Sequence, residues 1–259
     1  MPLTTANKDS NFVFPEIGSF FIELDEVAST NSYAIDKIQA NLAAHGTAFF
    51  AHAQTAGRGQ RGRQWVAEAG SNIIISCVVD TRLLSMQQQF SFSVCIALAC
   101  RNFFASNTGG DAAIKWPNDI YWRDRKAGGI LIENIIRGQE WHWAVVGIGI
   151  NINQTVFPDG LKNPVSLRQI TGKLLDAVAL AKQLCTFLEA SFQELLSWGA
   201  PKQLAAYNQY LYKANEQILL KKDSAVFSCT IKGVNEYGQL LVSGCSYDFF
   251  EFGEVEWVV

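Results

Sequence analysis

The chain has 259 residues, of which 49% are hydrophobic and 17% charged, a composition that is typical of globular proteins and excludes a disordered or fibrous chain. Its formal net charge of −3 provides no overall basic field, which argues against a role that rests on non-specific nucleic-acid binding. The apolar runs are far shorter than the ~20 residues of a membrane span, and the first residues lack the basic and apolar parts of a signal peptide. We therefore expect a cytoplasmic protein that does not associate with membranes.

The first third of the chain predicts alternating strands and helices. Residues 1–18 are polar and contain Pro2 and Pro15, which indicates a flexible arm before a first strand near 20–24. Ser29 and Thr30 are typical helix-start residues, and the apolar spacing that follows predicts a helix to about residue 44. The next elements are a strand, a loop rich in glycine and arginine, a second strand and a long buried helix, expected at 47–53, 54–71, 72–80 and 86–105.

The remainder divides into a β-rich region, a helical region and a β-rich tail. Residues 112–153 contain several strand-like runs separated by turn signals. Two or three helices are expected over 166–211, with Asp176 as the N-cap of the longest. From residue 213 short strands and turns indicate a small β-barrel. The sequence thus predicts a mixed α/β protein with an arm (1–18), a large domain (19–212) and a small β domain (213–259).

The six cysteines are scattered within apolar stretches and form no C-x-x-C pair. That spacing argues against a metal knuckle or a redox motif and favours reduced thiols in the core.

The glycine and arginine loop formally matches the dinucleotide-binding pattern G-x-G-x-x-G at residues 57–62, with Asp80 at a distance suited to a ribose-binding acid. That pattern must open a helix, yet the chain after Gly62 shows no helical period and enters a strand by Asn72. No G-K-[ST] follows the glycines, so a phosphate-binding P-loop is excluded as well.

This loop instead suggests a flexible backbone that closes over an anionic ligand. Arg58, Arg61 and Arg63 offer guanidinium groups to carboxylate and phosphate oxygens. Gln54 before the loop adds an amide, and Trp65 at its end adds an aromatic face. The alternative is a solvated basic turn.

Two further groups of residues suggest a nucleotide site. Lys115, Asn118 and Asp119 lie around a proline turn, where the carboxylate and amide oxygens are of the kind that Mg²⁺ takes when it is shared with substrate phosphates. Lys126 precedes a pair of glycines that permit close approach of a ligand. The alternative for the residues around the proline turn is a turn whose polar side chains bond their own backbone. The alternative for Lys126 and the glycines is an ordinary turn.

The strand at 145–153 alternates large apolar residues with small or polar ones at Gly147, Gly149, Asn151 and Asn153. One face of this strand is therefore nearly bare. Such a face suits a flat apolar ligand with an amide-bonding group, although tight packing against a helix would give the same pattern.

Taken together, these segments resemble the biotin protein ligases. The resemblance rests on STN at 29–31, QTAGRGQRGRQW at 54–65, KWPND at 115–119, KAGGILIE at 126–133 and VVGIGININ at 145–153, whose order and spacing are those of the family. It extends from about residue 20 to the end of the chain. It implies a mixed-sheet catalytic domain flanked by helices, similar to class II synthetases, and a C-terminal SH3-like β-barrel.

The resemblance implies an enzyme that couples the carboxylate of biotin to the α-phosphate of MgATP and then transfers biotin to a lysine of a biotin carboxyl carrier protein or carrier domain. Catalytic roles would fall to Lys126, Arg58, Lys115 and Asp119, with Asp119 holding Mg²⁺. The residues implied for biotin binding are Ser29, Thr30, Asn31, Gln54, Gly57, Arg58, Lys126 and Gly129. Those implied for ATP and the adenylate are Gln60, Arg61, Arg63, Trp65, Asn118, Gly149 and Asn151.

The chain departs from many relatives at Gln60, where they carry a further arginine. That raises the question of how tightly the loop retains the adenylate, and we expect normal ligation because the neighbouring arginines remain. Some relatives carry an N-terminal DNA-binding domain, whereas about 19 residues precede the first strand here, so we expect no operator binding. The resemblance leaves a homodimer open.

Two other classes of protein remain open. A lipoate or octanoate transferase has a similar catalytic domain but lacks the GRGQRGR loop. A non-catalytic biotin-binding module would bind the vitamin without exchanging pyrophosphate.

Overall fold

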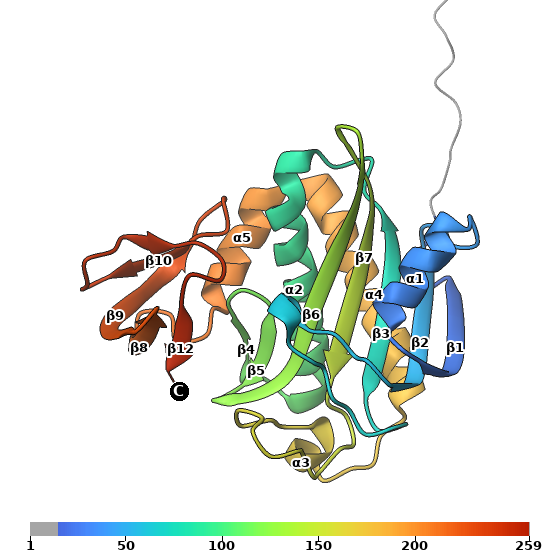
Figure 1. Ribbon diagram of the computed structural model, residues 1–259, viewed down its shortest axis with the longest axis horizontal. Coiled ribbons are helices and arrows are strands. Elements are labelled where there is room, and N and C mark those ends of the chain that lie inside the picture. The colour runs from blue at the N-terminus through green and yellow to red at the C-terminus, as the bar shows by residue number, and fades with distance from the viewer. Residues whose placement is uncertain (1–14, 259) are drawn as a thin grey trace, which may run out of the picture.

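A computed structural model describes residues 15–258, so residues 1–14 of the predicted arm lie outside the described residues. The molecule contains a large seven-stranded sheet and a smaller five-stranded sheet near the C-terminus (Figure 1). The order of strands in the large sheet is β1-β2-β3-β7-β6-β5-β4, and only β1 and β2 pair in parallel. The predicted mixed α/β class is confirmed.

The strands of the large sheet follow the predicted segments closely. Their bounds are β1 (Phe20–Val27), β2 (Thr47–Gln54), β3 (Ile73–Asp80), β4 (Ala112–Lys115), β5 (Asp119–Trp122), β6 (Arg125–Arg137) and β7 (Glu140–Ile150). Beyond Gly129, β6 pairs with β7 alone, because its pairing with the short strand β5 ends there.

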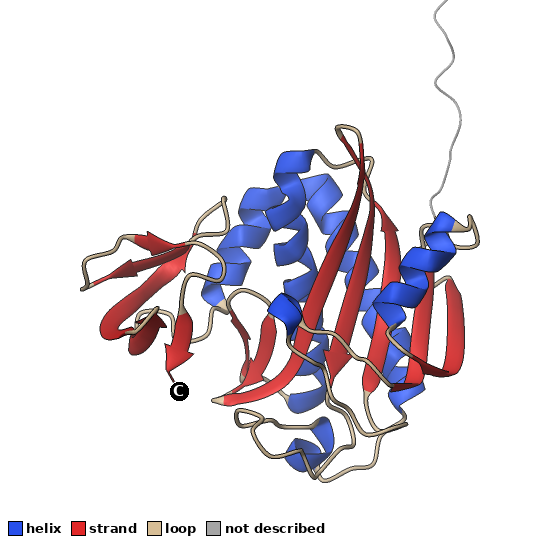
Figure 2. Ribbon diagram, in the orientation of Figure 1, coloured by secondary structure: helices blue, strands red, loops and turns tan. Residues whose placement is uncertain are grey.

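Within residues 15–258, five α-helices and two short 3₁₀ helices accompany this sheet (Figure 2). They are α1 (Thr30–Gln39), η1 (Gln60–Gly62), η2 (Met86–Gln88), α2 (Gln89–Thr108), α3 (Leu167–Thr171), α4 (Ala177–Trp198) and α5 (Ala200–Gln209). The carboxylate of Asp176 accepts hydrogen bonds from the backbone N–H groups of Val178 and Ala179, so the predicted N-cap of the longest helix is confirmed.

The prediction that the first helix reaches residue 44 is wrong. The helix ends at Gln39, and Asn41 adopts a left-handed backbone conformation with φ of 57°. Asparagine tolerates that conformation because its short polar side chain bonds locally. The apolar period continues past the end of the helix and therefore gave no sign of this break.

The two faces of the sheet have different coverings. Alternate residues of β2 separate them: Phe50 packs in the main core with α2 and α4, whereas Phe49 packs in a small cluster with Ala34 and Ile38 of α1. Figure 1 shows α1 on one face and α2 and α4 on the other. Because α1 covers only part of its face, the remainder of that face is free to form a site.

The C-terminal strands form an antiparallel sheet in the order β11-β10-β9-β8-β12, consistent with the predicted small SH3-like barrel. The strands are β8 (Gln217–Lys222), β9 (Ala225–Val234), β10 (Leu240–Ser243), β11 (Phe249–Phe250) and β12 (Glu256–Val258). Trp116 binds this part through a hydrogen bond of 2.9 Å from its indole Nε1 to the carbonyl oxygen of Gly238. The exact domain boundary at residue 213 stays a prediction.

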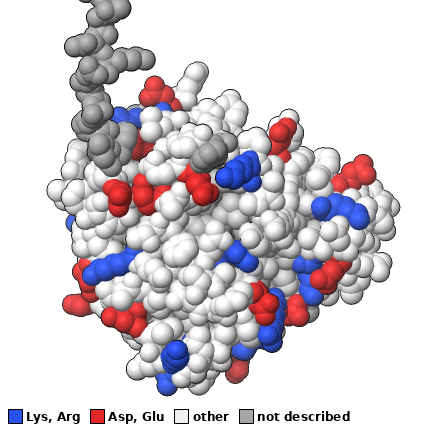
Figure 3. Space-filling model, turned by 180° about the vertical axis from the view of Figure 1, so that it is seen from behind, with Lys and Arg blue, Asp and Glu red and all other residues white. Residues whose placement is uncertain are grey.

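Three properties of the described residues bear on the sequence-based exclusions. No helix within residues 15–258 is long and apolar enough to cross a bilayer. On the face drawn in Figure 3, acidic and basic side chains are interspersed. All six cysteines are free thiols, and five of them are buried, as the sequence predicts.

Candidate active site

Two adjoining cavities lie where the predicted segments meet. One of about 50 Å³, the polar cavity, lies between the start of α1, the glycine and arginine loop, and the bare face of β7. The other, of about 440 Å³, is the basic cavity, and five cationic side chains line it: Arg61, Arg63, Lys115, Lys126 and Lys162. Gln60, Trp65 and Asn118 line both. The polar cavity alone thus brings together residues up to 120 positions apart in the sequence, from Ser29 to Gly149.

A buried hydrogen-bond network forms one wall of the polar cavity. Gln54 accepts hydrogen bonds from the backbone N–H of Thr30 at 2.8 Å and from its hydroxyl at 3.1 Å, so its amide completes the first turn of α1. The hydroxyl of Ser76 lies 2.7 Å from Thr30 Oγ1 and 2.6 Å from Asn31 Oδ1. Ser29, the N-cap residue of α1, is buried beside them. These groups can present fixed donors and acceptors to a small polar ring.

Sequence reasoning missed two members of this network, Ser76 and Glu133. The carboxylate of Glu133 accepts a hydrogen bond of 2.8 Å from Asn31 Nδ2 and forms an ion pair of 2.7 Å with Arg58. Glu133 thereby connects α1 to the glycine and arginine loop. A carboxylate at the end of the KAGGILIE segment, inside an otherwise apolar strand, was the signal that could have identified it.

The glycine and arginine loop is closed at its base. The backbone N–H of Trp65 donates to the carbonyl oxygen of Gly57 at 3.0 Å, and that of Gly59 donates to Arg63 at 2.7 Å. A Cβ on Gly57 would lie 2.3 Å from the carbonyl oxygen of Trp65, so only glycine fits at the base. The chain passes from Gly62 into β3 without an intervening α-helix, in agreement with the exclusion of a dinucleotide-binding fold.

The indole of Trp65 lies across the bare face of β7. A Cβ on Gly149 would be 2.3 Å from the indole ring, and one on Gly129 would be 3.6 Å from it. The indole Nε1 is buried and has no hydrogen-bond partner in the described residues. Trp65 therefore stands between the two cavities and occupies space that a ligand on this face would need.

The three arginines of the loop have different surroundings. Arg58 pairs with Glu133 beside the polar cavity, whereas Arg63 lines the basic cavity. Arg61 has a left-handed backbone with φ of 56°, and its guanidinium donates to the carbonyl oxygen of Gly253 in the C-terminal part. The loop is thus fixed on one side by the large sheet and on the other by the small one.

Lys126 lines the basic cavity, where it forms an ion pair of 2.7 Å with Asp119, and its Nζ would lie 3.6 Å from a Cβ on Gly129, which lines the polar cavity. Both side chains are partly exposed, with 32% and 22% of their surface accessible. Asn118 donates to the carbonyl oxygen of Ile130 at 2.7 Å, and the buried Asn151 donates to that of Val165 at 3.1 Å. The polar residues predicted for a nucleotide site therefore lie together and are held in place by backbone contacts.

Lys115 has an unusual environment for a lysine. Its side chain is buried, donates to the hydroxyl of Tyr121 at 3.0 Å, and lies over the rings of Tyr121, Tyr212 and Trp257 at 4.7, 5.7 and 5.2 Å from their centroids. The pKa of Lys115 is lowered to about 8, chiefly by burial; Asp119 opposes the shift, and nearby Lys126, Lys162 and Arg63 contribute to it. Sequence reasoning identified the lysine but not the aromatic rings around it.

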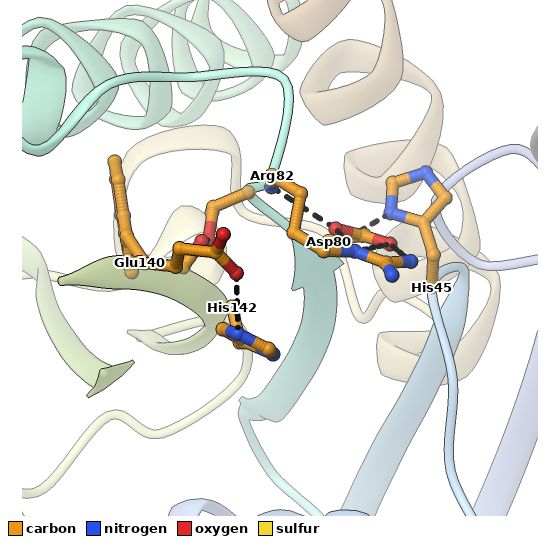
Figure 4. Close-up of polar contacts among 7 residues, drawn as sticks. His45, Asp80, Arg82, Glu140 and His142 are labelled. Carbon is orange, nitrogen blue, oxygen red and sulfur yellow. Dashed lines mark hydrogen bonds and ion pairs between the residues drawn. The ribbon is translucent and has the colours of Figure 1, made fainter. Parts of the chain in front are cut away.

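A second polar cluster lies at the far end of β3 and accounts for the remaining candidate acid (Figure 4). Asp80 pairs with Arg82, and the backbone N–H of Asp80 donates to His45 Nδ1 at 3.0 Å. Burial raises the pKa of Asp80, but its bonds with Arg82 outweigh burial and hold that pKa below its usual value. Asp80 lines neither cavity, so a ribose-binding role is ruled out. His142 Nε2 lies 3.1 Å from a carboxylate oxygen of Glu140 in the same region.

Comparison with known proteins gives consistent results. A family model described as the biotin/lipoate A/B protein ligase family matches residues 24–151. The chain is 32% identical over 199 residues to the biotin--[acetyl-CoA-carboxylase] ligase of Mycobacterium tuberculosis, covering 73% of this chain and 70% of that protein. It is 28% identical to the bifunctional ligase/repressor BirA of Bacillus spizizenii, covering 87% and 70%.

Among solved structures, the fold is similar to that of the biotin protein ligase from Aquifex aeolicus in complex with biotin and ATP. The TM-score is 0.75 at 23% identity, and the match covers 92% of this chain and 97% of that one.

Proposed function

This chain belongs to the biotin/lipoate A/B protein ligase family, and we propose that it acts as an ATP-dependent biotin protein ligase. In the first half-reaction, biotin and ATP form biotinyl-adenylate and release pyrophosphate. In the second, a lysine of a biotin carboxyl carrier domain displaces AMP. The ligase of Mycobacterium tuberculosis and the solved structure from Aquifex aeolicus are both named for biotin, which favours biotin over lipoate as the substrate.

The observation that carries the proposal is the junction of the two cavities. The polar cavity offers the donors and acceptors of Thr30, Asn31 and Gln54 to the polar ring of biotin. The basic cavity offers an excess of positive charge to the phosphates of ATP. Lys126 lines the basic cavity, and its ammonium group lies close to Gly129 of the polar cavity. The carboxylate of biotin and the α-phosphate of ATP would therefore react beside that ammonium group.

Catalysis of this kind rests on positioning and charge neutralisation rather than on a protein nucleophile. Lys115, Lys126 and Arg63 stabilise the charge on the phosphates, and Arg58 leaves Glu133 to reach the adenylate. Gln60, Asn118 and Asn151 line the nucleotide side. Trp65 moves from Gly149 to admit biotin and then packs beside the nucleotide.

We assign a magnesium ion to Asp119. Its carboxylate is partly exposed in the basic cavity, and within residues 15–258 no group of three or more histidine, cysteine, aspartate or glutamate side chains forms a dedicated metal cage. A single carboxylate suits Mg²⁺, which keeps several waters and shares its shell with substrate phosphates. Bound there, the ion would neutralise phosphate charge, and Lys126 would exchange its ion pair with Asp119 for contacts to the reacting groups.

The decisive experiment is the transfer of labelled biotin to a biotin carboxyl carrier domain, with and without ATP, with labelled lipoate in parallel. We expect incorporation of biotin only with ATP, and little incorporation of lipoate. A preference for lipoate would identify a lipoate transferase. Tight binding of biotin without biotin-dependent ATP–pyrophosphate exchange would identify a non-catalytic binding module.

A cytoplasmic location and the absence of operator binding belong to the same proposal. The free thiols support a reducing compartment, and the net charge of −3 argues against an extended DNA-binding surface. A salt-sensitive, specific complex with a DNA fragment would contradict the second point.

A further inference from the structure

A third cavity, which we call the aromatic cavity, opens beside the two that hold the small substrates. It has a volume of about 240 Å³ and lies between the start of α2, the part of β6 beyond its pairing with β5, and the C-terminal part of the chain. Gln60 and Asn118 line all three cavities, and Ile130 is shared with the polar cavity. The aromatic cavity therefore adjoins both substrate cavities at Gln60 and Asn118.

The aromatic cavity is acidic, whereas the basic cavity beside it is positively charged. No lysine or arginine lines it, whereas the basic cavity has five such residues. Its one carboxylate, Glu251, accepts a hydrogen bond of 2.6 Å from Gln239 and has no ion-pair partner among the described residues. An approaching cation would be repelled from the basic cavity and attracted to this one.

The walls of the aromatic cavity suit an aliphatic chain that carries a polar end. Phe90, Ile130, Ile132 and Phe252 supply apolar surface, and the amides of Asn118 and Asn134 add polar groups. A lysine side chain has this composition, with four methylene groups and a terminal ammonium. Tyr237 and Phe252 are 75% and 50% exposed, so the entrance is open to solvent.

We propose that the aromatic cavity is the route by which the lysine of the carrier protein reaches biotinyl-adenylate, with Glu251 attracting its ammonium group. This inference rests on the proposed function, in which three substrates must meet and two cavities are already assigned. Glu251 acts before the chemical step. The lysine then gives up one proton, its nitrogen attacks the biotinyl carbonyl carbon, and the C–O bond to the phosphate breaks. AMP leaves with the electron pair, and a second proton leaves the nitrogen as the amide forms.

Two variants test this route from different directions. Glu251→Gln removes the charge but keeps an oxygen for Gln239, and it should raise the KM for the carrier domain roughly fivefold, the size of one solvent-exposed ion pair. Asn134→Trp places a large side chain at an exposed strand position that lines the cavity, and it should lower transfer by more than about tenfold through steric exclusion. The matched control is Glu236→Gln, an exposed carboxylate in the same part of the chain that does not line the cavity.

Each variant is assayed with the full chain, both for biotin transfer to a carrier domain and for ATP–pyrophosphate exchange, which needs no carrier. We expect exchange to stay within about twofold of wild type in all three. Unchanged transfer by both Glu251→Gln and Asn134→Trp would overturn the route while leaving the proposed function intact. Equal loss of exchange and transfer would assign the cavity to adenylation instead, and failure of the wild type to transfer biotin would contradict the proposed function itself.

Discussion

At the scale of single residues, Lys126 provides the most direct test of the first half-reaction. Its ammonium lies 2.7 Å from Asp119 in the basic cavity, and the proposed function places it where charge would build up as biotin and the α-phosphate join. Losing one preorganised donor of this kind typically costs ~10²–10³ in rate, so Lys126→Met should reduce biotin-dependent ATP–pyrophosphate exchange by about that factor.

Folding should survive Lys126→Met, because the ion pair that it removes is partly exposed and contributes little stability. Transfer from preformed biotinyl-adenylate should be much less impaired than exchange. Equal losses in both assays would move Lys126 to general ligand binding. Lys173→Met, at an exposed position, is the matched control.

Glu133 provides a second test at the scale of residues. Its carboxylate holds Asn31 and Arg58 of the polar cavity, but in the proposed function it does not contact the reacting atoms. Glu133→Gln should weaken the contacts to Asn31 and Arg58 and raise the KM for biotin by about tenfold with kcat changed far less, the cost of a charge-assisted hydrogen bond. Measured in exchange assays, the effects of Glu133→Gln and Arg58→Gln should be non-additive. Strictly additive effects would show that the two side chains act separately.

At the scale of elements, the alternation along β7 predicted a bare face, and the structure shows what that face accommodates. A Cβ on Gly147 would lie 2.3 Å from Asn31 Oδ1, whereas a Cβ on Gly129 of β6 would have its nearest neighbour at 3.5 Å. Gly147→Ala should therefore lower the free energy of unfolding by about 1–3 kcal/mol through overpacking, and Gly129→Ala by less than about 1 kcal/mol. Urea denaturation of the two variants compares them, and equal stability would show that Asn31 moves aside without cost.

The sequence was a good guide to elements and to the segments that form the site, but not to how those segments meet. Period-2 and period-3.6 patterns and the N-cap at Asp176 are local signals, and they located the strands and the long helices. The position of Trp65 over Gly149 joins a loop to a strand 84 residues away, and no local pattern encodes such a contact. The role of Glu133 was missed for the same reason, since its partners lie 75 and 102 positions away.

At the scale of the whole molecule, the C-terminal part proves to be more than an appendage. Its separate β character was predictable from turn signals, yet Phe252, Gly253 and Trp257 return to line the basic cavity. That contact depends on how two sheets pack, which a single sequence does not reveal. The packing of the two sheets affects Lys115 most clearly, because aromatic rings from the large sheet region and from the C-terminal part enclose its side chain.

In the proposed function Lys115 binds the phosphates of ATP, so its low pKa should make the use of ATP depend on pH. Burial and neighbouring cations lower this pKa to about 8, so the ammonium is charged at pH 7 and loses its charge as pH rises through 8. The KM for ATP in biotin-dependent exchange should therefore rise between about pH 7 and pH 9. Lys115→Met should show a higher KM throughout that range and lack the rise, whereas the exposed control Lys221→Met should behave as wild type.

The lowered pKa of Lys115 also predicts how the free energy of unfolding changes with pH. Between about 8 and the ordinary value of 10.5, the unfolded chain keeps a proton on Lys115 that the folded chain has released. Stability rises with pH wherever the unfolded state binds more protons. Relative to Lys115→Met, the wild type should therefore gain stability as pH increases through this window, as urea denaturation at pH 7.5, 8.5 and 9.5 would measure. If the stability of both proteins depended on pH in the same way, Lys115 would keep its proton despite the aromatic enclosure. A rise in the KM for ATP over this pH range would then have to come from the titration of another group.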